Sequence, residues 1–152
     1  MILLGIDPGT RCAGYGIIKK EKQTQLIDYG YLELPKKYPL VERVGMFHSF
    51  FNDKIIQHSV TNLAIETPFL GKNVSTYGKL SYLRGILYLL AYTHHLHLQE
   101  FAPLEIKKGI TGYKCASKEQ VAKMVSKFFP GIKAKRDDTT DAIAIVLCGI
   151  WS

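Results

Sequence analysis

The sequence predicts an α/β protein with a five-stranded mixed β-sheet flanked by α-helices. Three short strands are expected first, and the links between them are too short to hold a helix, so they should pair as an antiparallel meander. The hydrophobic period then changes, and helical segments alternate with strand-like segments along the rest of the chain. A helix between two strands implies a right-handed crossover and a parallel pair, which makes the sheet mixed.

The first half of the chain is expected to contain four strands and one helix. The first strand, residues 2–7, is an apolar run that stops at Asp-Pro-Gly, a strong turn signal. Two more strands, at 14–19 and 24–34, are joined by a short polar connection. Apolar residues then recur at helical spacing over residues 40–55, which predicts a helix. A fourth strand should follow at 62–65.

The second half is expected to contain three helices and one strand. Apolar residues at helical spacing predict a helix from about Ser75 to His95, followed by a strand at 96–101 that Pro103 closes. The capping-box pattern Ser117-Lys-Glu-Gln120 opens the next helix. A last helix should begin near residues 137–138. No repeat or linker divides the chain, so residues 1–152 are expected to form one domain.

The composition favours a globular protein with an anionic partner over a membrane or secreted protein. With 152 residues, 47% hydrophobic and 22% charged, the chain is an ordinary globular protein with room for a core. Its net charge of +7 favours a nucleic acid or another anionic partner. No apolar run approaches the ~20 residues of a membrane span, and the first residues lack the basic start of a signal peptide. Three cysteines without C-x-x-C spacing favour reduced thiols and a cytoplasmic location.

Four acidic residues stand at the ends of expected elements. Asp7 and Glu66 follow the first and fourth strands, and Asp138 and Asp141 are spaced to share one face of the last helix. If the two strands lie side by side and parallel, their carboxyl ends share one edge of the sheet, where ligands bind in open α/β folds. Docking the start of the last helix on that edge would bring all four carboxylates together.

Each acid also has an ordinary interpretation. Asp7 could serve the turn that follows it, Glu66 could be a solvated strand end, and Asp138 could cap the last helix. Their conjunction favours a cation site, because clustered carboxylates destabilise a fold unless cations neutralise them. A ligand set of oxygens alone favours Mg²⁺ or Mn²⁺ over Zn²⁺. In a basic protein the matching chemistry is two-metal phosphodiester hydrolysis, with ions ~3.5–4 Å apart.

Five groups of residues, spread over nearly the whole chain, match one known family. They are Gly5-Ile-Asp-Pro-Gly-Thr10 with Gly14-Tyr-Gly16; Ala64-Ile-Glu66 with Phe69, Asn73, Ser75, Leu80 and Arg84-Gly85; Ala102-Pro103 with Lys107; Ala116 and Lys118 with Gln120-Val121 and Met124-Val125; and Asp138-x-x-Asp141-Ala142. On these residues the sequence resembles the RuvC family of Holliday junction resolvases, which have the RNase H-like fold.

The resemblance implies a set of functional residues. The four metal-binding catalytic positions of the family match Asp7, Glu66, Asp138 and Asp141, which would hold two Mg²⁺ ions per active site, with Mn²⁺ as a substitute. The basic residues near the scissile phosphate match Lys107 and Lys118, and Phe69 matches an aromatic that stacks on bases. The family acts as a homodimer that places two symmetric nicks in four-way junction DNA during recombination and repair. A branch-migration helicase complex is the further partner that it implies.

Other residues receive weaker predictions. A basic set is expected to contact DNA phosphates: Lys72, Lys79, Arg84, Lys107, Lys108, Lys114 and Lys118. Three tyrosines of the long helix, Tyr82, Tyr88 and Tyr92, are expected in the core or in a dimer interface. The cluster His94, His95 and His97 is expected to have an ordinary surface or core role.

Three other functions share parts of these patterns. A sugar kinase or actin-like ATPase has the same core and a similar turn after its first strand, but it needs a second domain and a further phosphate loop. A non-catalytic junction-binding relative would be expected to lose carboxylates. A ribonuclease H that acts on RNA–DNA hybrids would use the same metal chemistry, and a substrate panel separates it from a resolvase.

Overall fold

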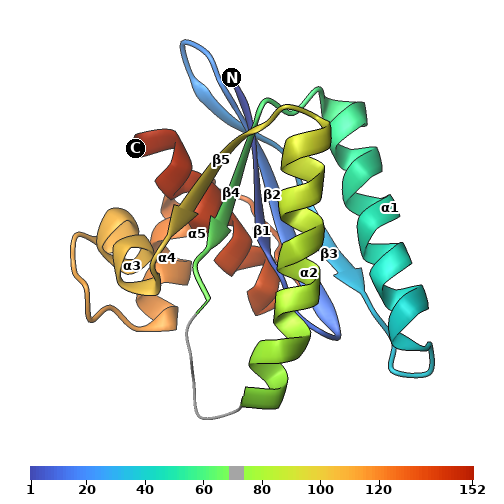
Figure 1. Ribbon diagram of the computed structural model, residues 1–152. Coiled ribbons are helices and arrows are strands. Elements are labelled where there is room, and N and C mark those ends of the chain that lie inside the picture. Colours follow the sequence, from blue (N-terminus) through green and yellow to red (C-terminus); the bar gives the residue numbers. More distant parts are fainter. Residues whose placement is uncertain (69–73) are drawn as a thin grey trace.

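The computed structural model, which describes residues 1–68 and 74–152, has one five-stranded sheet and five helices (Figure 1). The strands are β1 (Ile2–Asp7), β2 (Cys12–Lys20), β3 (Thr24–Glu33), β4 (Asn62–Glu66) and β5 (His97–Phe101). The helices are α1 (Leu40–His58), α2 (Val74–Thr93), α3 (Pro103–Thr111), α4 (Lys118–Phe128) and α5 (Asp137–Trp151).

The sheet is mixed, as the sequence predicts. Its strand order is β3-β2-β1-β4-β5, with β1–β2 and β2–β3 antiparallel and β1–β4 and β4–β5 parallel. In the β1–β4 pair Ile6 stands opposite Ile65, so the next residues, Asp7 and Glu66, leave the two central strands at the same edge. The parallel pairing that brings these two acids together is therefore confirmed.

Helices cover both faces of the sheet (Figure 1). One apolar cluster lies between the sheet and α1 and α2, and includes Leu4, Phe47 and Leu87. A second cluster lies between the opposite face and α3, α4 and α5, and includes Leu3 and Ile145. Since successive strand residues point to opposite faces, the consecutive apolar residues of β1 supply both clusters.

Helix α5 packs closely against the centre of the sheet because glycines make room for it. A Cβ atom built on Gly5 would lie 2.6 Å from the Cβ of Val146, and one built on Gly14 would lie 1.9 Å from the main-chain oxygen of Asp138. Any side chain at either position would push the helix away from the sheet. These glycines therefore fix how close the acidic start of α5 comes to the end of β1.

The sequence prediction missed helix α3. The fifth strand ends at Phe101, before Pro103, as predicted, but Pro103 is also the first residue of α3, where its missing N–H and fixed φ are well suited to a helix. The Glu105 side chain accepts a hydrogen bond from the Ala102 N–H (2.6 Å), and Gly112 ends the helix with a φ of 78°. The helix carries Lys107, for which the sequence predicts a role beside the scissile phosphate.

Two predictions about helix starts can be compared with the structure. The capping box at Ser117 is confirmed, since its Oγ accepts from the Gln120 N–H (3.2 Å) and the Gln120 side chain accepts from the Ser117 N–H (2.8 Å). The interpretation of Asp138 as a helix cap is wrong, because Arg136 occupies the N-cap position of α5. The Asp138 side chain is therefore free of a capping role.

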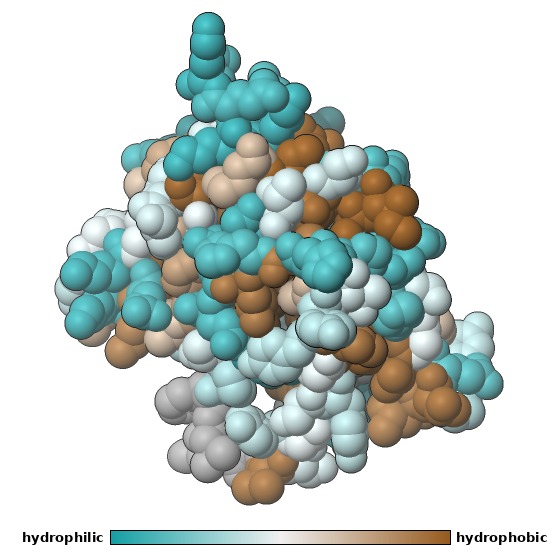
Figure 2. Space-filling view, turned by 45° about the horizontal axis from the view of Figure 1, so that its top comes forward, coloured by the Kyte–Doolittle hydropathy of each residue, from teal (hydrophilic) through white to brown (hydrophobic). Residues whose placement is uncertain are grey.

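The part of the surface seen in Figure 2 is largely hydrophilic, with apolar residues exposed in several separate places. Among the described residues, no helix combines the length and apolar character needed to cross a membrane. The three cysteines carry free thiols, with Cys115 exposed and the other two buried.

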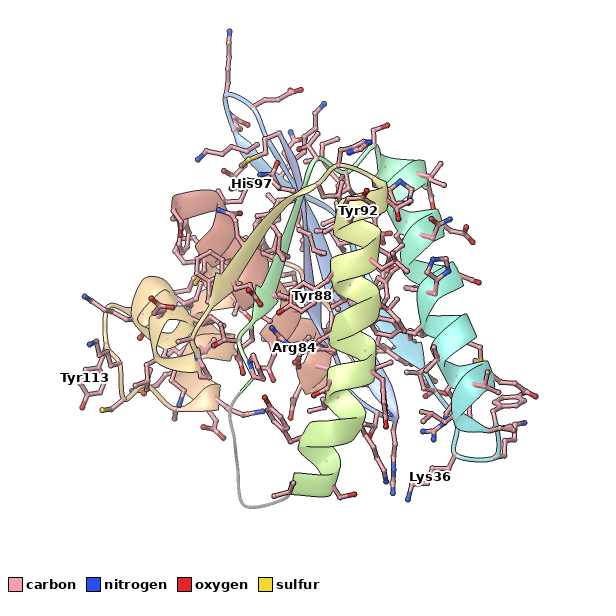
Figure 3. All side chains as sticks on the ribbon, viewed as in Figure 1. Lys36, Arg84, Tyr88, Tyr92, His97 and Tyr113 are labelled. Carbon is pink, nitrogen blue, oxygen red and sulfur yellow. The ribbon has the colours of Figure 1, made fainter. Side chains whose placement is uncertain are left out.

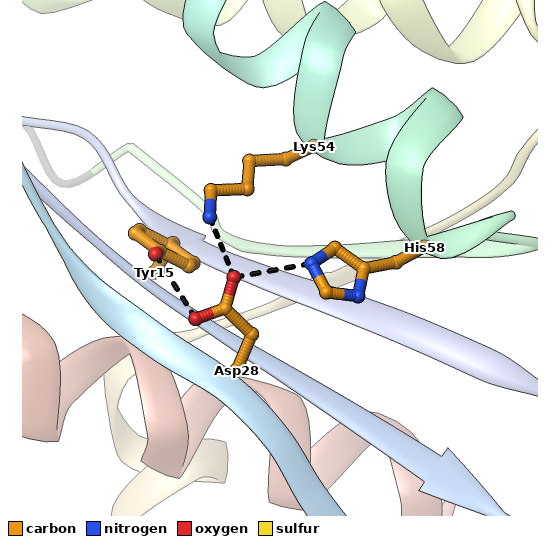
Figure 4. A network of polar contacts seen from close by, with 4 residues as sticks. All are labelled: Tyr15, Asp28, Lys54 and His58. Atoms are coloured by element: carbon orange, nitrogen blue, oxygen red, sulfur yellow. Dashed lines mark hydrogen bonds and ion pairs between the residues drawn. The ribbon is translucent and has the colours of Figure 1, made fainter.

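A polar network ties α1 to the edge of the sheet (Figure 4). The Asp28 carboxylate of β3 accepts from Lys54 Nζ (2.6 Å) and from the Tyr15 hydroxyl (3.3 Å), and His58 Nε2 lies 3.1 Å from it. Burial alone would raise the pKa of Asp28, but Lys54, together with His58 and Tyr15, outweighs burial and holds the pKa below its ordinary value. The ionised carboxylate thus stabilises the fold.

We expect Asp28→Asn to lower the free energy of unfolding by about 1–2 kcal/mol at pH 7, because charge-assisted hydrogen bonds are lost. The stabilisation by Asp28 is fully present above the ordinary pKa of 3.8 and is lost as the pH falls through the lowered pKa of the folded protein. Urea denaturation at pH 7 and below pH 4 measures this. A gap between wild type and variant that does not shrink in acid would contradict the assignment.

Candidate active site

Three elements bring four carboxylates to one edge of the sheet. Asp7 ends β1, Glu66 ends β4, and Asp138 and Asp141 lie near the start of α5. A pocket of ≈ 320 Å³ opens beside them, lined by the side chains of Asp7, Glu66, Asp141, Lys107, Lys118 and several apolar residues of α3, α4 and α5. Asp138 does not line this pocket, but its charge acts on both Asp7 and Asp141.

The carboxylates raise one another's pKa values. Burial raises the pKa of Asp7 to about 8, and the charges of Asp141, Glu66 and Asp138 add to the rise. Burial likewise raises the pKa of Glu66, with Asp141 contributing, and it raises the pKa of Asp141 against the opposing effect of Lys118. An ionised cluster of this kind is costly near neutral pH unless positive charge enters it.

Two lysines face the carboxylates from the other wall of the pocket. Lys118, at the start of α4, donates from Nζ to Asp141 Oδ2 (3.2 Å), and the charge of Asp141 raises the lysine's pKa. Lys107, from α3, is half-buried and acts to lower the pKa of Glu66. The ammonium groups of both lysines are therefore placed where they could bind a phosphate.

The donor set fits a hard divalent cation. Its ligands are carboxylates from Asp7, Glu66, Asp138 and Asp141, and such oxygen ligands suit Mg²⁺ and Mn²⁺. In residues 1–68 and 74–152 no three His, Cys, Asp or Glu side chains stand close enough together to enclose an ion. Burial is the main cause of the raised pKa values of these carboxylates and their mutual repulsion adds to it, so a bound cation would favour their ionised forms.

The other predicted DNA contacts are spread over the molecule. Lys79 is exposed on α2, Lys108 is exposed on α3, and Lys114 is exposed between α3 and α4. Phe69 and Lys72, for which the sequence predicts DNA contacts, lie outside the described residues. The structure therefore brings Lys107 and Lys118 to the carboxylates and leaves the other described lysines on the surrounding surface.

Arg84 does not agree with the prediction of a direct DNA contact. The residue is buried, and its guanidinium donates to Glu100 Oε1 (2.6 Å), to the Tyr88 hydroxyl (3.1 Å) and to the main-chain oxygen of Glu66. A guanidinium with these partners is already paired inside the protein. Sequence reasoning missed this network, although the four-residue spacing of Arg84 and Tyr88 on one helix was a usable signal.

The predictions for the tyrosines of α2 and for the histidines that follow it compare differently with the structure. Tyr82, Tyr88 and Tyr92 are 57%, 42% and 80% exposed, so the prediction that they could be core residues is wrong and the dimer interface stays a prediction. His94, the residue after α2, has its Nε2 2.7 Å from Asn52 Oδ1 of α1. This contact agrees with the ordinary structural role expected for the histidine cluster.

A mixed sheet in this strand order, with acids at the ends of its two central strands and on a helix packed over them, defines a nuclease of the RNase H-like class. Comparison with known proteins identifies the family within that class. The family model described as Crossover junction endodeoxyribonuclease RuvC matches residues 3–149. The chain belongs to the RuvC family and is an endodeoxyribonuclease.

Individual relatives support the same assignment. The chain is 39% identical to the crossover junction endodeoxyribonuclease RuvC of Chloroherpeton thalassium, over 98% of this chain and 81% of that protein. The structure of Thermus thermophilus RuvC superposes with a TM-score of 0.89 at 25% identity, covering 99% of this chain and 94% of that one. T. thermophilus RuvC in complex with a Holliday junction substrate gives a TM-score of 0.88 at 26% identity, covering 97% and 92%.

Proposed function

We propose that residues 1–152 form one nuclease domain that resolves four-way DNA junctions in recombination and repair by cutting two strands symmetrically. The observation that carries this proposal is the convergence of Asp7, Glu66 and Asp141 on one pocket that Lys107 and Lys118 also line. Carboxylates for cations beside lysines for a phosphate are the groups that phosphodiester hydrolysis needs. The four-way junction as substrate rests on the relative whose structure contains a Holliday junction.

The carboxylates of Asp7, Glu66, Asp138 and Asp141 would hold two Mg²⁺ ions, for which Mn²⁺ can substitute. Such ions, when bound, supply an activated water and charge stabilisation for the leaving oxygen. Lys118, now paired with Asp141, and Lys107 bind the oxygens of the scissile phosphate and hold it in the pocket. The apolar wall formed by Ile106, Val121 and Ala144 limits the access of bulk water.

The surrounding lysines extend the DNA-binding surface. Lys79, Lys108 and Lys114 are exposed, and each phosphate that they neutralise releases counterions, so junction binding should weaken steeply as salt rises. From the sequence we add Lys72 as a phosphate contact. We also add Phe69, whose ring would stack on bases of the opened junction.

We further propose that the enzyme acts as a homodimer through the exposed face of α2. That face carries Tyr82, Leu89 and Tyr92, large side chains that are at least 55% exposed. Two-fold symmetry in the dimer would match two equivalent strands of a four-way junction. A branch-migration helicase complex is the expected partner, and the free thiols suit the cytoplasm.

A panel of labelled substrates tests the proposed function. Incubated with Mg²⁺, the protein is expected to place paired symmetric nicks in a mobile four-way junction and to leave plain duplex and an RNA–DNA hybrid intact. Asp138→Asn should bind the junction without cutting it. Cleavage of the hybrid instead would mean that the chemistry is right and the substrate wrong. Tight junction binding by the wild type without cleavage in Mg²⁺ or Mn²⁺ would indicate a binding protein.

A further inference from the structure

Arg84 of α2 is a buried cation with several partners inside the protein. Its side chain is 7% exposed and forms an ion pair with Glu100 of β5, whose side chain is 37% exposed. The Tyr88 hydroxyl closes the network by donating to the same Glu100 oxygen (2.7 Å), and the guanidinium lies 5.7 Å from the centre of the Tyr88 ring. With the hydrogen bond that Arg84 Nη2 donates to the Tyr88 hydroxyl (3.1 Å), three contacts, to Glu100, to the Tyr88 hydroxyl and to the Tyr88 ring, fix the position of the guanidinium group.

The fourth contact joins this network to the active site. Arg84 Nη1 donates to the main-chain oxygen of Glu66, the residue that ends β4 and whose carboxylate lines the catalytic pocket. Arg84 and Tyr88 lie on the side of α2 that faces β4 and β5 (Figure 3). The link runs across the sheet as well, because Glu100 stands opposite Ile65, the residue before Glu66.

We propose that Arg84 is a positioning residue that fixes the main chain of Glu66 and thereby sets the direction from which the Glu66 carboxylate approaches the metal site. Glu100 and Tyr88 hold the guanidinium in place for this role. The inference rests on the proposed function, since it concerns a ligand of that same site. Partners of this kind, which orient a ligand without touching the metal, typically change metal affinity or activity by roughly 10–100-fold.

A direct contact between Arg84 and DNA is the rival explanation. Arg84 also lines a smaller pocket of ≈ 220 Å³ with Asp7, Glu66, Thr67 and Tyr77, on the side of the two acids that faces α2. The two explanations differ in what Glu100 does. If Arg84 positions Glu66, loss of the Glu100 charge weakens the site; if Arg84 binds a phosphate, the same loss frees the guanidinium for DNA.

The test compares Glu100→Gln, Arg84→Met and Arg84→Lys with the wild type. The first measurement is thermal unfolding at increasing MnCl₂ or MgCl₂ without DNA; the growth of the stabilisation with metal concentration gives the metal concentration that half-saturates the folded protein, which we call the metal midpoint. The second is junction binding in EDTA at several salt concentrations. Asp28→Asn is the matched control, since it also replaces an ion-paired carboxylate by an amide but lies on β3 at the other edge of the sheet.

We expect the metal midpoint to rise about tenfold or more in Glu100→Gln and Arg84→Met, less in Arg84→Lys, and not in Asp28→Asn. Junction binding in EDTA should stay within about twofold of wild type in all of them. Unchanged metal midpoints would overturn the inference. A phosphate contact would give a different pattern, which would also overturn the inference. In Arg84→Met the slope of log binding constant against log salt concentration would fall by about one, and Glu100→Gln would bind the junction as tightly as wild type or more tightly.

The same measurements distinguish a failure of this inference from a failure of the proposed function. If Arg84→Met does not fold, Glu100→Gln decides, because it keeps the buried cation and changes one charge. If metal stabilises the wild type but no junction is cut, the proposed substrate is wrong and the positioning role still stands or falls on the metal midpoints. If neither metal stabilises the wild type, the metal site and the positioning role are both wrong.

Discussion

Asp7→Asn is expected to abolish junction cleavage while making the metal-free protein more stable at pH 8. Burial and the three neighbouring acids raise the pKa of Asp7 to about 8, far above its ordinary value of 3.8. The stability that the protonated carboxyl contributes is fully present below about pH 4 and is lost as the pH rises through about 8. Asparagine cannot ionise, so the variant escapes this loss and cannot donate a carboxylate to a cation.

Denaturation in EDTA at pH 5 and pH 8 measures the effect. Between these two pH values the wild type should lose roughly 2–4 kcal/mol more stability than the variant. Adding Mg²⁺ at pH 8 should stabilise the wild type more than the variant, and cleavage by the variant should fall on the order of 10³-fold or more. Asp53→Asn, a change at an exposed acid of α1, is the control and should do neither. Equal pH dependence of wild type and Asp7→Asn would refute the coupling among the acids.

Gly14→Ala is expected to cost about 3 kcal/mol or more of stability and to lower cleavage about 100-fold, because it displaces the start of α5. The added Cβ would lie 1.9 Å from the main-chain oxygen of Asp138, so the helix must move away from β2. Asp138 and Asp141 would then move away from Asp7 together. Chemical denaturation and junction cleavage measure the two effects.

Gly45→Ala is the matched control for this substitution. Gly45 lies in α1 and is exposed, and a Cβ there meets no atom within 4 Å. The change should stabilise the protein by about 0.5–1 kcal/mol, as alanine for glycine does in an open helical position. Cleavage should be unaffected. A Gly14→Ala variant as stable and active as Gly45→Ala would show that α5 can shift without consequence for the site.

Much of this site could be predicted because its signals are local. Asp7 follows an apolar run and precedes a turn signal, and Glu66 follows a second such run, so each acid is marked by the end of its own strand. The spacing of Asp138 and Asp141 places both on one helix face. The helix predicted between the third and fourth strands implied a parallel pair in the sheet, and the parallel pairing of β1 with β4 brings Asp7 beside Glu66.

Other features could not be read in this way. Pro103 is compatible with the end of a strand and with the first turn of a helix, and its preceding residues gave no means of choosing. Arg84 is predicted as a DNA contact because it follows Lys72 and Lys79 along the chain, whereas burial of an arginine depends on a distant partner. That partner, Glu100, is 16 residues away on β5. A local sequence pattern does not predict an ion pair between residues of different elements.

The strands, the mixed sheet and the four acids could be predicted from the sequence, because hydrophobic period, turn residues and the chemistry of carboxylates act over a few neighbouring residues. The groups that surround those acids depend on the tertiary structure. It set Lys118 against Asp141 and Arg84 beneath the main chain of Glu66. Burial and interactions between charges that are remote in sequence arise only when those segments pack together. They raise the pKa of Asp7 to about 8. The ionised carboxylate is therefore costly in this site unless a cation neutralises it.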